Sequence, residues 1–140
     1  MITDLPSLLS LASTPEGLQQ LRVMVALIEG YQKHPVFDLW YIDGFHGFNP
    51  KTTHIEPLPE YSTSLDAMAA LLKDKGPAFM SRYALHLTDT YRADWERLSH
   101  DQQQEQSCGD FSAYIYDFAL KPDTWRWVVA FILASQKVPA

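Results

Sequence analysis

The chain has 140 residues, of which 46% are hydrophobic, and this is the size and composition of one globular domain. Its formal net charge of −6 argues against a nucleic-acid-binding protein, because such proteins need a basic surface. The one cysteine, Cys108, excludes an internal disulfide, and no apolar run reaches the roughly 18–20 residues that span a bilayer. We therefore expect a single cytoplasmic domain over residues 1–140, with no direct contact to nucleic acid or membrane.

The N-terminal part, residues 1–34, is expected to be helical. The run "LPSLLSLAS" places its leucines on one side of a short helix. The run "TPEGLQQLRVMVALIEGY" follows, in which Thr14 suits the N-cap, Pro15 the first helical position and Glu16 the positive end of the helix dipole. Its apolar residues keep helical spacing as far as Tyr31.

Residues 35–140 are expected to form a helix-on-sheet part. "VFDLWYI" at 36–42 is rich in β-branched and aromatic residues and predicts a strand, and "DGFHGFNP" at 43–50 predicts a turn or hairpin tip. "STSLDAMAALLKDKG" at 62–76 predicts an amphipathic helix. With Thr63 as its N-cap, Asp66 falls at the third helical position, so the two residues resemble a capping box.

The C-terminal half mixes both types of element. Alternating apolar residues in "AFMSRYALHL" at 78–87 predict a strand, the polar run 93–106 predicts a helix with a solvated glutamine-rich end, and 111–120 predicts another strand. The run 122–136 fits either a buried strand or a helix. Together these elements predict the α+β class, a small antiparallel sheet packed with helices in a layered sandwich.

One stretch also carries a family resemblance. "LPEYSTSLDAMAALLKDKG", preceded by Trp40 in a glycine-bearing segment, resembles the phage ABA sandwich domain family, small proteins of tailed phages and prophages. The resemblance implies that 122–136 is a closing helix, and it brings no catalytic residues with it. The chain departs from the family pattern in its large N-terminal helical part and in the glutamine-rich insert at 89–108.

Motifs of catalysis or cofactor binding are missing from the sequence. It contains no P-loop, dinucleotide-binding glycine motif or nucleophile elbow. The candidate metal ligands lack the tight spacing of a metal site, and we expect no enzyme activity, no cofactor and no metal. These ligands are His34, Asp43, His46, His54 and Glu56.

An aromatic cluster around the predicted turn is the candidate partner-binding site. Trp40, Tyr41, Phe45, His46 and Phe48 crowd a segment that holds two glycines. Aromatic residues on an exposed loop are typical of protein-binding hot spots. The alternative is that Trp40 and Phe45 pack into the core, which is the usual place of large aromatic side chains.

The expected function follows from the resemblance and the charge. We expect a non-enzymatic phage accessory protein that binds a host protein or complex, such as an inhibitor of bacterial antiviral defence of the anti-CRISPR kind. The acidic charge suits a partner with a basic, nucleic-acid-binding surface. The alternative is a protein that binds or sequesters a small nucleotide-type ligand in an aromatic pocket with basic residues. A further alternative is a homodimer with Trp125 on the interface between the two subunits. The arginines available for such a pocket are Arg22, Arg82, Arg92, Arg97 and Arg126.

Overall fold

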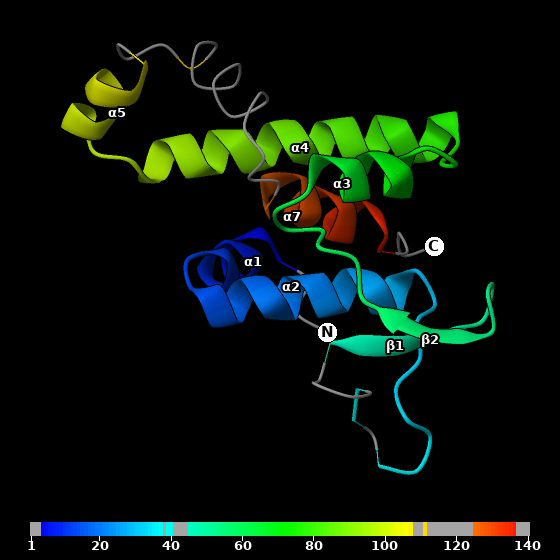
Figure 1. The fold of residues 1–140 in the computed structure, drawn as a ribbon. Helices are drawn as coiled ribbons and strands as arrows, with labels where there is room; N and C mark the ends of the chain where they lie inside the picture. Colours follow the sequence, from blue (N-terminus) through cyan, green and yellow to red (C-terminus); the bar gives the residue numbers. More distant parts are fainter. Residues whose placement is uncertain (1–3, 38, 41–44, 108–110, 112–124, 137–140) are drawn as a thin grey trace.

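A computed structural model describes residues 4–37, 39–40, 45–107, 111 and 125–136. Within these ranges the chain forms six helices and a two-stranded antiparallel sheet, which confirms the α+β class (Figure 1). The helices are α1 (Leu5–Ala12), α2 (Pro15–Ile28), α3 (Leu65–Leu72), α4 (Pro77–Arg97), α5 (His100–Ser107) and α7 (Trp125–Ala134). The strands are β1 (His46–Asn49) and β2 (His54–Pro57).

The two N-terminal helices begin where the sequence predicts. Thr14 Oγ1 accepts a hydrogen bond of 3.0 Å from the Gly17 backbone N–H, so Thr14 is the N-cap of α2. Gly17 also allows α1 and α2 to approach closely, because a Cβ at this position would lie 1.7 Å from the Leu11 carbonyl oxygen. This contact fixes the sharp turn between α1 and α2.

The C-terminus of α2 is closed by backbone hydrogen bonds around a glycine. Gly30 has φ +97°, its N–H donates to Leu27 O at 3.1 Å, and the Tyr31 N–H donates to Ala26 O at 3.0 Å. This pattern is a Schellman motif, which favours glycine at the left-handed position. Gln32 then pairs with Phe48 through two backbone hydrogen bonds of 2.9 Å, so the end of α2 is joined to β1.

The predicted strand at 36–42 is wrong over the residues that are described. Residues 35–37 form a turn, and residues 39–40 have no regular structure. His34 favours this irregular conformation. Its side-chain Nδ1 accepts a hydrogen bond of 3.1 Å from the Val36 N–H, and its backbone N–H donates to Leu39 O at 2.8 Å. Such local bonds compete with strand pairing.

The turn or hairpin tip predicted at 43–50 is wrong over residues 46–49. His46–Asn49 is a strand that pairs antiparallel with His54–Pro57, and Asn49 lies opposite His54. The hairpin turn instead lies at 50–53, where the Thr53 N–H donates to Asn49 O at 2.8 Å and Thr53 has φ 60°.

The predicted strand at 78–87 is also wrong, because this run belongs to the long helix α4. The buried side chains Tyr83, Thr90, Tyr91 and Trp95 follow helical spacing, whereas Leu85 is 69% exposed. The alternation of apolar residues extends over only a few positions, and the residues that share one face of the helix are the ones that pack in the core.

The polar run 93–106 is split between two helices. α4 ends at Arg97, and Ser99 opens α5 with a capping box that the sequence reading missed. The Gln102 N–H donates to Ser99 Oγ at 3.2 Å, and the Ser99 N–H donates to Gln102 Oε1 at 2.8 Å. The predicted strand at 111–120 lies outside the described residues, except for Phe111.

The N-cap of α3 is Ser64, so the predicted cap at Thr63 is wrong by one residue. Ser64 Oγ accepts from the Ala67 N–H at 3.1 Å, and Asp66 lies in the first turn without closing a capping box with Thr63. Thr63 instead lies in the turn before the helix, where its N–H donates to Glu60 O at 3.1 Å.

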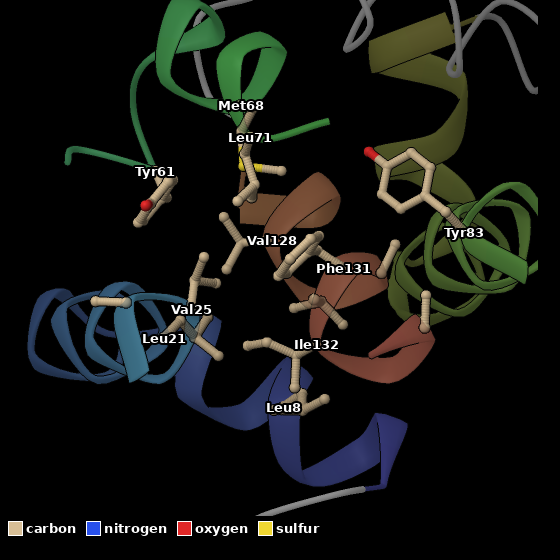
Figure 2. Packing of buried hydrophobic residues seen from close by; sticks show 14 of the residues in the cluster. Leu8, Leu21, Val25, Tyr61, Met68, Leu71, Tyr83, Val128, Phe131 and Ile132 are labelled. Carbon is tan, nitrogen blue, oxygen red and sulfur yellow. The ribbon is translucent and has the colours of Figure 1, made fainter. Parts of the chain in front are cut away.

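The core is built around α7, which the resemblance correctly indicated to be a helix. α7 packs against α1, α2 and α4, and it lies between α4 on one side and α1 and α2 on the other (Figure 1). Phe131 points into the centre of this cluster, and α3 adds Met68 and Leu71 from one side (Figure 2). The buried Arg126 joins α7 to α4, because its Nη2 lies 2.7 Å from Asp94 Oδ2.

Candidate functional site

The predicted aromatic cluster does not form one exposed patch. Trp40 is half-buried and packs against the main core. A Cβ on Gly47 would lie 2.9 Å from the Trp40 ring, so glycine is needed for this contact. The core alternative therefore holds for Trp40, while Tyr41 lies outside the described residues.

The remaining members of the cluster lie on or beside the hairpin. His46 and Phe48 are half-buried in β1, and Phe45 precedes it. The Phe45 ring packs against α2, with the Arg22 guanidinium 5.3 Å from the ring centroid. Phe45 also lines a largely apolar groove of about 360 Å³ along α2. The other residues that line this groove are Gln19, Gln20, Val23 and Met24.

The most exposed apolar residues near this region were assigned to a strand by the sequence reading. Val36 is 75% exposed, Phe37 is 68% exposed and Leu39 is 65% exposed. We call these three residues the apolar loop. Three large apolar side chains gathered in four positions are unlike the single exposed apolar residues of an ordinary surface. The preceding His34-Pro35 pair, which favours a turn over a strand, is the sequence signal that could have found them.

The apolar loop is held in shape by His34. Besides the backbone bonds to this residue, the His34 ring lies 4.8 Å from the Phe37 ring, centroid to centroid. Val36, Phe37 and Leu39 thus each contact His34 while their side chains face solvent. Contacts that restrain apolar side chains before binding reduce the conformational entropy lost on binding, and this favours recognition of a protein partner.

A second hollow, of about 230 Å³, lies where the end of α2, the β-hairpin and α3 meet. Its walls combine two tyrosine rings, an aliphatic floor and several polar groups. Burial raises the pKa of Tyr61 above its ordinary range, and burial together with the Glu56 charge raises the pKa of Tyr31. Both phenols therefore stay protonated at neutral pH. The lining residues are Glu29, Tyr31, Asn49, Lys51, Pro59, Tyr61, Ala67, Ala70 and Leu71.

The arginines considered for a ligand pocket do not line this hollow. Arg22 and Arg126 are buried in structural contacts, and Arg97 lies 3.9 Å from Asp94. Arg82 and Arg92 lie over aromatic rings, at 5.6 Å from the Phe79 centroid and 4.5 Å from the Phe111 centroid. Lys51, Tyr31 and Tyr61 line the hollow, where the sequence predicted arginines.

The candidate metal ligands that lie within the described residues do not come together in a metal site. Among the described residues no group of three or more His, Cys, Asp or Glu side chains could hold a metal ion, and Asp43 and Cys108 lie outside that part. No helix within the same ranges is long and apolar enough to cross a membrane.

Comparisons with protein-family models, with curated proteins and with solved structures found no match to this chain. The resemblance to the phage ABA sandwich domain family therefore stays a prediction from the sequence.

Proposed function

We propose that this chain is a non-enzymatic accessory protein that binds a host protein or protein complex through the apolar loop. The observation that carries the proposal is the exposure of Val36, Phe37 and Leu39, with Val36 held by the hydrogen bond to His34 Nδ1. A few residues near the centre of an interface supply most of its binding energy, and buried aromatic anchors are frequent among them. The groove along α2 beside Phe45 offers a further apolar surface.

The charge of the chain supports a partner with a basic surface. A net charge of −6 attracts basic surfaces over several ångströms and repels acidic ones. We propose a host protein whose contact surface has an apolar centre and a basic rim, as nucleic-acid-binding proteins can provide. A role in the host cytoplasm against bacterial defence, including an anti-CRISPR role, is supported by the family resemblance alone.

The test uses serine substitutions with a matched control. The triple variant Val36→Ser, Phe37→Ser and Leu39→Ser removes the apolar loop, whereas Leu85→Ser removes an equally exposed leucine from α4. Bacterial lysate is passed over each immobilised protein. The expected result is one partner that the wild type and the Leu85 variant retain and the triple variant loses.

Two outcomes would overturn the proposal. One is a partner that binds the triple variant as well as the wild type. The other is the absence of any partner at low salt, where the attraction between charged surfaces is strongest. Circular dichroism of the triple variant separates a lost surface from a lost fold.

A further inference from the structure

The hollow between α2, the β-hairpin and α3 has features of a small-molecule site. Tyr31 and Tyr61 supply aromatic rings, and Ala67, Ala70 and Leu71 supply an aliphatic side. A volume of about 230 Å³ suits one or two fused rings, since a cavity of roughly 150 Å³ holds benzene. Aromatic and aliphatic walls with a few fixed polar groups are typical of ligand pockets.

The polar groups at this hollow are held in place by partners in the protein. Asn49 Nδ2 donates to Glu56 Oε1 at 2.8 Å, and Asn49 Oδ1 accepts from the Lys51 N–H at 3.0 Å. Burial raises the pKa of Tyr31, so its phenol keeps its proton and can donate a hydrogen bond to an acceptor on a ligand.

The carboxylates at and beside the hollow have partners in the protein, and Lys51 adds one cation to the lining. Glu29 Oε2 lies 3.0 Å from Lys75 Nζ, although Glu29 sits at the negative end of the α2 dipole. Glu56 accepts hydrogen bonds from Asn49 and from Thr52 Oγ1. A paired carboxylate attracts cations weakly but still has lone pairs for an N–H donor.

We propose that this hollow binds a neutral planar heterocycle with an adjacent N–H and C=O, the edge that a nucleobase such as uracil or hypoxanthine presents. Glu29 accepts from the ligand N–H, and the Tyr31 hydroxyl donates to the ligand carbonyl. The ring packs between the tyrosines and the α3 alanines. The residues differ from those of the apolar loop, so ligand binding and partner binding can fail separately.

The test is an NMR titration of the intact chain with uracil and hypoxanthine. 1,3-Dimethyluracil is the matched probe, because it keeps the ring and both carbonyls but has no N–H. The expected result is saturable binding with shifts at residues around the hollow, and affinity for dimethyluracil lower by about tenfold or more, as for a site that loses a buried polar partner. Equal affinity for both probes, or no saturable shift with either nucleobase, would overturn the proposal.

A pair of variants shows whether binding occurs in this hollow. Ala70 and Ala69 are exposed neighbours on α3, but Ala70 lines the hollow and Ala69 does not. Ala70→Leu should abolish binding by filling the space, and Ala69→Leu should leave it unchanged. Retained binding in the Ala70 variant contradicts the site. Tighter binding of tyramine than of uracil would contradict the ligand class, because it would indicate a cation site.

Discussion

Arg22 Nε donates a hydrogen bond of 2.9 Å to the carbonyl oxygen of Pro59, across 37 positions of the chain. The same guanidinium donates to Leu58 O, and Arg22 as a residue is 7% exposed. One buried side chain on α2 therefore satisfies two backbone carbonyls of the segment that leads into α3. Ser62 adds a third link, because its Oγ donates to Leu18 O at 3.3 Å.

Arg22→Met should destabilise the protein while preserving much of the side-chain volume. It leaves the Leu58 carbonyl without its donor, whereas the Pro59 carbonyl keeps the hydrogen bond of 3.0 Å from the Tyr61 N–H. A buried unsatisfied carbonyl costs about 1–3 kcal/mol. Arg22→Lys should recover part of this loss, because an ammonium lacks the fork that reaches both carbonyls. Urea denaturation measures the free energy of unfolding. A methionine variant as stable as the wild type would show that the link contributes nothing.

The α3 cap gives a prediction with a control at the adjacent residue. Ser64→Ala should lower the free energy of unfolding by about 0.5–2 kcal/mol, because it removes the acceptor for the Ala67 N–H. Thr63→Ala should change it by no more than about 0.5 kcal/mol, since Thr63 is exposed outside the helix. Thermal and urea unfolding of both variants show whether Ser64 or Thr63 is the N-cap of α3. A larger loss at Thr63 would restore the cap assignment made from the sequence.

The sequence predicted elements well where local signals and the core agree. Thr14 and Pro15 mark the start of α2 by backbone chemistry that depends on few distant contacts. The end of α2 at Ile28, before Gly30, was not predicted, because the apolar spacing continues as far as Tyr31. The run 78–87 was misread because its aromatic residues suit a strand locally, while packing against α7 decides the helix. Propensity is a weak guide wherever tertiary contacts override it.

The candidate sites were harder to predict because they depend on exposure and on distant segments. Residue type alone does not predict that Trp40 is packed beside Gly47 while Phe37 is exposed. The hollow joins Tyr31 to Tyr61, which come together only because Gln32 pairs with β1 and Arg22 holds the segment before α3. The spacing of the two tyrosines in the sequence does not indicate that they line the same hollow.

Two left-handed backbone positions should respond to mutation in opposite directions. Thr53 has φ 60°, which is unfavourable for a β-branched residue, so Thr53→Asn should stabilise the protein by about 0.5–1 kcal/mol. Gly30 has φ 97° and open space around its Cβ position, so Gly30→Ala should destabilise by about 1–2 kcal/mol through the backbone alone. Thermal unfolding measures both. Stabilisation by Gly30→Ala would contradict the helix end described for α2.

Tyr83 should make the protein sensitive to alkaline pH. Its hydroxyl is buried, has no hydrogen-bond partner within the described residues, and points away from α4 into the packed interior (Figure 2). Burial raises the pKa of Tyr83 above the unfolded value of about 10. As pH rises, the unfolded chain releases this proton first, so the stability contributed by the protonated phenol is complete below about pH 10 and is lost above it.

Tyr83→Phe tests this by removing the hydroxyl and keeping the ring. At neutral pH the variant should be more stable by about 1 kcal/mol, because it no longer buries an unsatisfied polar group. From pH 9 to 11 its free energy of unfolding should fall less than that of the wild type. Urea denaturation across this range gives both quantities. Parallel pH profiles, or a variant less stable at neutral pH, would show that the hydroxyl is satisfied in the folded chain.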